Sequence, residues 1–303
     1  MKNALLMSAL ILPVLISSCD DYSQDEYEFF YVVEAYMIAG RQLPHIILST
    51  TTPADAYYSF EDTAVEDAIV QIRLLNTASN SEVESVFNYI MTEPGIYNAS
   101  VSHRILPLRT YELNITFPQS AREITAHTTI PDTFHIKEGV PDFIVYRSTE
   151  QLEITVSESS YPGRQNIFVF NTISLRPEAV NLTPLYRTIY EDGGEDPDEL
   201  YLLANNDSGI INEGNFDVNP DGTFTIEFPW LGFSFYEENL VIANTIDDNL
   251  YDFVRSRSVQ LGGSSLSPGE IQNVISNING GVGVFGAMAS DTVQTIVQRP
   301  LAP

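Results

Sequence analysis

Residues 111–117 read Tyr-Glu-Leu-Asn-Ile-Thr-Phe, so apolar and polar side chains alternate without a break. Successive side chains of a β-strand point to opposite faces of its sheet, so this alternation gives one buried face and one wet face. The same period of two recurs at residues 70–74, 152–156 and 224–228. The pattern predicts a mainly β protein whose sheets keep one face in water, as β-sandwiches do.

Turn sequences punctuate these segments, and the segment from Pro131 to Pro141 indicates a connection between two regions. Pro94-Gly95, Pro162-Gly163 and the run 219–222 (Asn-Pro-Asp-Gly) are typical of tight turns. We expect an N-terminal β-sandwich over residues 27–131, a connector over 132–141 and a second β-rich domain over 142–303.

The second region is also expected to hold one or two short helices. Asp247 and Asp248 can cap a helix, and Leu250, Phe253 and Val254 then fall on one face. A shorter helical turn is predicted after Ser267. Residues 191–215 are rich in Asp, Glu, Asn and Gly, and predict a long exposed acidic insertion between strands.

The N-terminus has the features of a secretory signal. Lys2 precedes an apolar run that ends in Ile16-Ser17-Ser18-Cys19, where an aliphatic residue and two small residues precede the cysteine. Cys19 is the only cysteine in the chain, so it cannot form an internal disulfide. We therefore predict a lipoprotein signal peptide at 1–18, lipidation of Cys19 and an acidic tether over 19–26.

The charge of the chain limits its partners. Fourteen Lys and Arg residues stand against forty-one Asp and Glu residues, a net charge of -27. Phosphate contacts need clustered cations, so nucleic-acid binding is excluded as a working hypothesis. The charge is most simply a means of solubility at a crowded surface.

The order of several segments resembles a known family. These segments are residues 65–72 (Val-Glu-Asp-Ala-Ile-Val-Gln-Ile), 94–97 (Pro-Gly-Ile-Tyr), 128–131 (Thr-Thr-Ile-Pro), 251–253 (Tyr-Asp-Phe) and the glycine-rich 279–287. In this order they resemble the Bacteroidetes lipoproteins grouped as domain of unknown function 4249. The resemblance extends over nearly the whole chain after Cys19.

The resemblance implies an outer-membrane lipoprotein, often encoded near TonB-dependent receptors. It implies an N-terminal sandwich similar to immunoglobulin-like and carboxypeptidase-regulatory modules, and it supplies no catalytic residues. Asp20 and Asp21 resemble the acidic signal for surface export in that group, although the usual lysine is absent. We therefore expect a lipid-anchored outer-membrane protein that can be exposed at the cell surface.

Two motifs favour structural roles over ligand binding. The run 280–286 lacks the following helix that a phosphate loop requires, so its glycines are predicted to allow close backbone contact. Asp217, Asn219 and Asp221 match the first half of a calcium loop, but Phe228 stands where a bidentate acid should be. A hairpin turn is the favoured interpretation of this segment, and calcium is the alternative.

Catalytic motifs are missing from the sequence. The four histidines lie too far apart to form a zinc pair, and no Gly-x-Ser-x-Gly elbow occurs. We predict no enzymatic activity, no cofactor and no metal. A pair of distant acids, as in a glycosidase, stays open because a β fold can bring them together.

Aromatic clusters provide the candidate contacts. Tyr57 and Tyr58 stand in a predicted loop, where exposed tyrosines can bind a ligand or a partner protein. Residues 29–31 (Phe-Phe-Tyr) are assigned to core packing. Taken with what the family resemblance implies, these features favour a non-enzymatic accessory of a TonB-dependent receptor. An adhesion or structural protein is the alternative, and a glycan-active enzyme is the third possibility.

Overall fold

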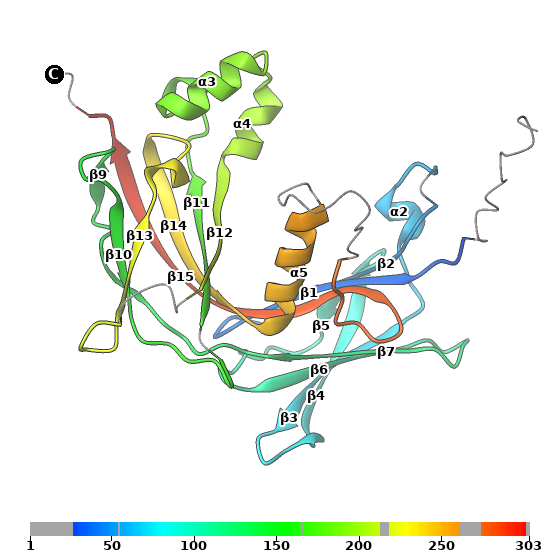
Figure 1. Cartoon of the computed structure of the whole chain (residues 1–303). Coiled ribbons are helices and arrows are strands. Elements are labelled where there is room, and N and C mark those ends of the chain that lie inside the picture. The colour runs from blue at the N-terminus through cyan, green and yellow to red at the C-terminus, as the bar shows by residue number, and fades with distance from the viewer. Residues whose placement is uncertain (1–26, 54, 165, 213–217, 261–273, 301–303) are drawn as a thin grey trace, which may run out of the picture.

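The computed structural model describes residues 27–53, 55–164, 166–212, 218–260 and 274–300. The predicted signal peptide, the lipidation site at Cys19 and the tether to residue 26 lie outside the described residues, and so does the start of the helical turn predicted after Ser267. Within the described residues the chain is mainly β, as the alternating segments predicted (Figure 1). No helix in these ranges is long and apolar enough to cross a bilayer.

One large mixed sheet dominates the described part of the chain. Its strands follow the spatial order β12-β11-β14-β15-β1-β2-β5-β4-β3-β6-β7, and β9 pairs with β15 beside this path. The bounds are β1 Tyr31–Ile38, β2 Ile46–Thr50, β3 Ile69–Asn76, β4 Ser79–Glu93, β5 Ile96–Ala99, β6 Thr110–Thr116, β7 Glu123–Thr129, β9 Phe143–Val145, β11 Ile167–Ser174, β12 Asn205–Asn212, β14 Glu237–Ile246 and β15 Val282–Gln298.

A smaller sheet of order β13-β10-β8 packs beside the second half of the large one. Its strands are β8 Ile136–Glu138, β10 Leu152–Val156 and β13 Phe224–Phe228. The four alternating segments of the sequence form β3, β6, β10 and β13. Their apolar members are buried, for example Ile72 on β3 and Ile226 on β13, which confirms the period-two prediction.

Strand β15 belongs to two hydrophobic cores at once. Its first half pairs in parallel with β1, and its second half pairs antiparallel with β14. We call core 1 the buried cluster from Val33 to Ile130 that also takes in Ile278, Phe285 and Ala287. Core 2 is the cluster from Phe134 to Val297 that takes in Ala289. The last strand, which the sequence assigned to the second region alone, therefore packs in both cores.

A backbone bridge closes core 1 on its far side. The amide of Asn279 donates to the carbonyl of Thr125 on β7 at 2.9 Å, and the amide of Thr125 donates back at 3.1 Å. The chain segment that leads into β15 thus contacts β7, the last strand of the sheet order. Strands β1 to β7 and the start of β15 consequently surround core 1.

Glycines permit the close approach of β15 to its neighbours. Gly283 has φ +117°, and a Cβ there would lie 2.1 Å from the carbonyl oxygen of Val33 on β1. A Cβ at Gly286 would lie 2.5 Å from Leu250 Cγ. The predicted structural role of this glycine-rich run is therefore confirmed, because side chains at these two positions would separate packed elements.

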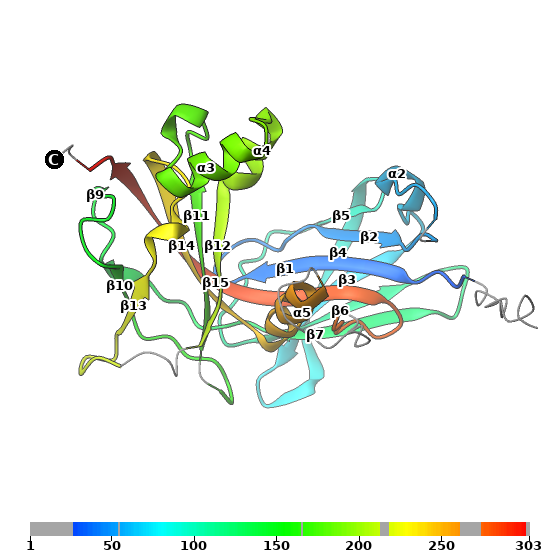
Figure 2. The ribbon, with the colours of Figure 1, turned by 45° about the horizontal axis from the view of Figure 1, so that its top comes forward.

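The described helices are short and lie on the periphery of the sheet. They are α2 Phe60–Thr63, α3 Pro184–Asp192, α4 Pro197–Leu203 and α5 Asp248–Gln260, with 3₁₀ turns η2 Ala179–Asn181 and η4 Trp230–Gly232. Helix α5 confirms the helix predicted after Asp247. Figures 1 and 2 show α3 and α4 at one end of the molecule, α2 at the other, and α5 against β15 and β1.

The acidic segment near 191–215 has more regular structure than its composition indicated. It contains the end of α3, all of α4 and strand β12. Helix α4 forms because Asp196 caps it, accepting a hydrogen bond from the amide of Asp198, and Pro197 occupies the first helical position. Residues 191–198 are nevertheless exposed and lie between β11 and β12, as the sequence predicted.

Candidate functional site

A groove of about 410 Å³ lies between α5 and the large sheet, and we call it the α5 groove. Helix α5 contributes one face, and strands β1, β11, β12, β14 and β15 contribute the other. The lining residues are Tyr36, Val169, Asn171, Ile173, Asn205, Ile242, Asn244, Ile246, Leu250, Phe253, Val254, Arg257 and Met288.

The groove exists because the sheet carries apolar side chains on both of its faces at this place. On β14, Val241 and Ala243 point into core 2, so Ile242 and Ile246 point to the opposite face and line the groove. On β11, Phe170 points into core 2 in the same way. A sheet with one wet face would carry mainly polar residues on that second face. The apolar residues that stand here beside Asn171 and Asn244 therefore mark a surface that helix α5 covers only in part.

Two asparagines give the groove a fixed polar floor. The side-chain amide of Asn244 donates to Asn171 Oδ1 at 3.0 Å and to the carbonyl of Val169 at 3.0 Å. The hydroxyl of Ser290 donates in turn to Asn244 Oδ1. These bonds fix the orientation of Asn244 and Asn171, so the polar atoms of the floor are held in place before any ligand arrives.

Arg257 supplies the positive charge of the groove. Within the part of the chain that the structure describes, no carboxylate lies within 4.0 Å of its guanidinium, whereas Arg255 pairs with Asp252 at 3.6 Å. Burial raises the pKa of Tyr36, which also lines the groove, as does the negative charge of Glu34, while the positive charge of Arg257 opposes the rise. Arg257 therefore places a cation without a close carboxylate partner, among the described residues, beside a largely apolar surface.

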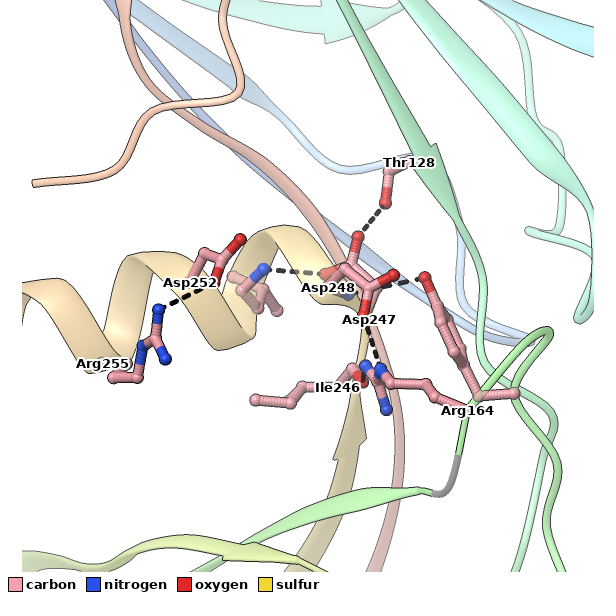
Figure 3. Close-up of polar contacts among 9 residues, drawn as sticks. Thr128, Arg164, Ile246, Asp247, Asp248, Asp252 and Arg255 are labelled. Carbon is pink, nitrogen blue, oxygen red and sulfur yellow. Dashed lines mark hydrogen bonds and ion pairs between the residues drawn. The ribbon is translucent and has the colours of Figure 1, made fainter.

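Helix α5 is fixed at its N-terminus by a buried carboxylate (Figure 3). Asp247 is 1% exposed, its Oδ1 accepts from the amide of Leu250 at 2.9 Å, and its Oδ2 accepts from the Thr128 hydroxyl at 2.6 Å. Burial raises the pKa of Asp247 to about 6, although these hydrogen bonds act in the opposite direction. Asp247 thus caps α5 and joins the helix to β7.

Residues 161–164 brace the same end of α5 from the other side. Arg164 donates to Asp248 Oδ1 and to the carbonyl of Ile246, and the amide of Asp248 donates to the Tyr161 hydroxyl at 3.4 Å (Figure 3). Burial raises the pKa of Tyr161 to about 12. The start of α5 is therefore held from both sides. These contacts fix the position of the helix, which forms one wall of the groove, relative to the sheet.

Tyr57 and Tyr58, the predicted contact residues, lie in a different place from the α5 groove. Tyr57 is 93% exposed and Tyr58 is 56% exposed. Tyr58 lines a second groove, of about 600 Å³, together with Phe60 and residues of β1, β2 and β5, among them Val32, Ile47 and Ile96. We call this the Tyr58 groove. The loop position inferred from the sequence is correct, but the α5 groove was not predicted.

The assignment of residues 29–31 to core packing is wrong for its first two members. Phe29 is 41% exposed and Phe30 is 50% exposed, whereas the ring of Tyr31 stacks on Phe117 at 4.3 Å between centroids. Phe29 and Phe30 precede β1, so no neighbouring strand covers them. The aromatic cluster at 230–236, by contrast, is packed inside: Trp230, Phe233, Phe235 and Tyr236 are all buried.

The segment considered as a calcium loop forms a turn. Asn219 Nδ2 donates to the hydroxyls of Thr223 and Thr225, and Asp221 Oδ1 accepts from the amide and the hydroxyl of Thr223. These hydrogen bonds lower the pKa of Asp221. Asp217 lies outside the described residues. The polar atoms of Asn219 and Asp221 therefore serve the turn that the sequence favoured.

Metal-binding groups do not assemble elsewhere in the described ranges either. No cluster of three or more His, Cys, Asp or Glu residues is present among residues 27–300 outside the gaps at 54, 165, 213–217 and 261–273. His127 pairs singly with Glu112 at 3.0 Å, and His135 lies 3.7 Å from Asp291.

The comparison with protein families agrees with this architecture. The model of the family described as "Domain of unknown function (DUF4249)" matches residues 20–294. The chain belongs to the DUF4249 family. The match covers core 1, all of the α5 groove and all of core 2 except Val297, and it confirms the family resemblance drawn from the sequence. No curated protein matches this DUF4249 member.

Two solved structures give low-scoring matches to this DUF4249 member. The first is a tetra-tandem repeat in the extending region of a large adhesion protein, with 10% identity and a TM-score of 0.21. The second is a protocadherin gamma B2 fragment of extracellular cadherin domains 3–6, with 9% identity and a TM-score of 0.19. Each match covers 89% of this chain, which spans about half the length of those chains. At these scores neither likeness carries an argument about function.

Proposed function

We propose that this protein is a non-enzymatic binding protein that a lipid on Cys19 anchors in the outer membrane. In this proposal the α5 groove holds a ligand, and the protein acts as an accessory of a TonB-dependent receptor. The observation that carries the proposal is the α5 groove itself. It is a largely apolar, partly open surface with fixed amides and with Arg257, a cation that no carboxylate among the described residues pairs.

The chemistry of the lining indicates the class of ligand. Ile173, Ile242, Phe253 and Val254 offer an apolar surface, which favours an apolar body. Arg257 favours a negatively charged group at the helical wall, since a guanidinium binds carboxylate or phosphate oxygens well. The expected ligand is therefore an amphipathic molecule with an anionic head.

The same lining supports binding in preference to catalysis. Its residues include no carboxylate and no histidine, the groups that most often transfer protons in enzymes. Tyr36 is the one acid among them, and burial moves its pKa further from neutrality. The raised pKa leaves Tyr36 protonated at neutral pH, where it can donate a hydrogen bond to a ligand but cannot act as a base.

Anilinonaphthalene sulfonate is a suitable probe, because it joins an apolar ring system to an anionic group. We expect a fluorescence titration to show saturable binding. Arg257→Gln should weaken the binding about fivefold, the equivalent of about 1 kcal/mol for a partly exposed charge pair. Val254→Asp, which puts a negative charge into the groove, should weaken it further.

Arg255→Gln is the matched control, because Arg255 stands two residues away on α5 but pairs with Asp252 instead of lining the groove. Its affinity for the probe should equal that of the unchanged protein. Equal weakening by the substitutions at 255 and 257 would show that the effect is general charge, and the assignment of the α5 groove would fail.

The anchoring and the receptor association need separate measurements. The intact mass of the protein extracted from membranes should show cleavage before Cys19 and an added lipid, and Cys19→Ser should lack both. Mild crosslinking of intact cells, with an affinity tag at the C-terminus, should recover a TonB-dependent receptor. Recovery of no outer-membrane protein would remove the accessory role but would leave ligand binding standing.

A further inference from the structure

We propose that the end of the fold next to the tether contacts the surface of the membrane through five exposed aromatic side chains. This interfacial patch consists of Tyr27, Phe29, Phe30, Tyr57 and Tyr58. The inference rests on the proposed anchoring at Cys19, and it adds a second, non-covalent contact between the protein and the bilayer.

The exposure of these side chains is the first argument. Tyr27 is 48% exposed, and each of the other four retains at least 41% of its surface in water. Isolated exposed aromatic residues need no explanation, but a contiguous apolar patch usually marks an interaction site. Five such residues at one end of the molecule therefore indicate an interaction surface.

Hydrogen bonds join the start of the fold to the chain segment that leads to Tyr57 and Tyr58. The hydroxyls of Tyr27 and Thr51 lie 2.7 Å apart, and the amide of Phe30 donates to Thr51 Oγ1 at 3.0 Å. Thr51 and Tyr58 both line the Tyr58 groove. Residues 27–30 are thus attached to the loop that carries Tyr57 and Tyr58, beside α2 at one end of the molecule (Figures 1 and 2).

The inner side of the patch is packed against the body of the protein. Phe29 meets Tyr31 edge to face at 5.5 Å, and the guanidinium of Arg122 lies 5.3 Å from the Phe29 ring centroid. Tyr31 stacks in turn on Phe117. These contacts fix the ring of Phe29 in an outward position, so its exposure is a property of the fold.

The length of chain before Tyr27 identifies the occupant as a lipid surface. Eight peptide units join Cys19 to Tyr27, and a fully extended chain of that length spans at most about 29 Å. A lipid on Cys19 therefore keeps Tyr27 within about 29 Å of the headgroups. This end of the molecule is therefore the end that the tether keeps within reach of the bilayer.

The composition of the patch suits the boundary between headgroups and acyl chains. Tyrosine and phenylalanine rings bury apolar area there, and the tyrosine hydroxyl stays hydrated. Glu28, Glu61 and Asp62 flank the patch, and the whole chain is strongly acidic. Anionic headgroups repel such a surface, so the expected partner is a zwitterionic lipid surface.

Fluorescence quenching tests the contact directly. The chain from Cys19 onward, which contains every described residue, is coupled through its only thiol to a maleimide lipid in phosphatidylcholine vesicles with brominated acyl chains. In Tyr57→Trp, the new indole should shift to shorter wavelength and lose at least half of its emission. Trp230 is 5% exposed in core 2, so its constant contribution is subtracted.

Tyr201→Trp is the matched control, because Tyr201 is 73% exposed on α4 at the other end of the molecule. Its indole should show no quenching. Adding Phe29→Ser and Phe30→Ser to Tyr57→Trp should restore most of the emission, and vesicles rich in anionic lipid should reduce the quenching. Equal quenching at 57 and 201, or none at 57, overturns the proposal.

The chemical coupling separates this test from the proposed natural lipidation. Because the maleimide lipid supplies the anchor, quenching at position 57 does not depend on whether cells acylate Cys19. The intact mass of the protein from cells decides acylation on its own. The two proposals can therefore fail independently.

Discussion

Asp247 is the buried residue at which α5, β7 and β15 meet. Its carboxylate caps the helix and accepts from Thr128, while its amide donates to the carbonyl of Ala287 on β15 at 2.9 Å. Three titratable groups surround it. Asp248 and Arg164 pair with each other, and the third group is the neutral phenol of Tyr161. A carboxylate in this position is well hydrogen-bonded but still pays a desolvation cost when it ionises.

This cost makes stability depend on pH in a definite direction. Because the folded-state pKa of Asp247, about 6, exceeds the ordinary value of 3.8, protonation favours the folded state. The stabilisation is complete below about pH 3.8 and is lost as the pH rises through 6. At pH 7 the unfolding free energy is therefore about 3 kcal/mol lower than it would be with Asp247 protonated.

Asp247→Asn should isolate this contribution. An amide keeps an oxygen for the Leu250 amide and is never charged, so the variant should gain stability relative to the unchanged protein between pH 4 and 7. Urea unfolding at several pH values measures the difference. A difference that stays constant across this range would mean that the burial of Asp247 carries no pH dependence. Asp142→Asn, at an exposed side chain outside this cluster, serves as the control.

At the scale of elements, β15 is the strand whose path depends most on its sequence. Gly283 brings its backbone against β1, and its positive φ would strain any other residue. Gly40 also has a positive φ, +73°, but a Cβ there would meet nothing within 4 Å. Comparing substitutions at the two glycines therefore separates the cost of a steric clash from the cost of backbone strain.

Gly283→Ala should cost much more than Gly40→Ala. The first change adds a clash with the Val33 carbonyl to the strain of a positive φ, and should lower the unfolding free energy by about 4 kcal/mol or prevent folding. The second adds strain alone, about 1 kcal/mol. Denaturant unfolding of both variants measures the costs, and similar values for the two would contradict the close approach of β15 to β1.

The elements also show how far sequence patterns reach. Strands such as β6, with Leu113 and Ile115 on one face, follow from period-two alternation, and α5 follows from its cap and its apolar spacing. Helix α4 was not predicted, because an acidic composition concealed the cap at Asp196 and the proline that begins the helix. Helix α3, which begins at Pro184 before the acidic segment, was not predicted either. Their signal was present in the order of residues but not in their composition.

The candidate site was less accessible to prediction than the elements. Tyr57 and Tyr58 were found because turn residues mark loops, whereas the α5 groove combines one helix with five strands that lie far apart in the sequence. Periodicity gives the face on which Ile242 lies, but it does not give the pairing of β1 with β15. Such pairings depend on tertiary contacts across the whole chain.

At the scale of the whole molecule, the sharing of β15 joins the two cores mechanically. Phe285 and Ala287 pack in core 1, and Ala289 and Val297 pack in core 2, all on one uninterrupted strand. We therefore expect the cores to unfold in a single transition, because neither can lose β15 without opening the other.

Leu113→Ala tests this coupling with Trp230 as the reporter. Leu113 is fully buried in core 1, so its truncation should cost 2–5 kcal/mol, whereas Trp230 lies in core 2. The denaturant midpoint from Trp230 fluorescence should fall together with the midpoint from circular dichroism. Leu202→Ala, at a side chain 77% exposed on α4, should leave both midpoints in place. An unchanged fluorescence midpoint in Leu113→Ala would show independent cores.

The position of β15 also sets the order of events when the protein is made. Val32, near the start of the fold, pairs with Val282. One edge of β1, the first strand to be synthesised, therefore stays uncovered until β15, the last strand, has been made. Because a chain leaves the ribosome N-terminus first, it can bury neither core completely until almost all of it has been synthesised. Until then β1 presents an open edge to its surroundings. Premature termination between the end of β1 and residue 282 is therefore expected to leave an aggregation-prone fragment in place of a smaller stable domain.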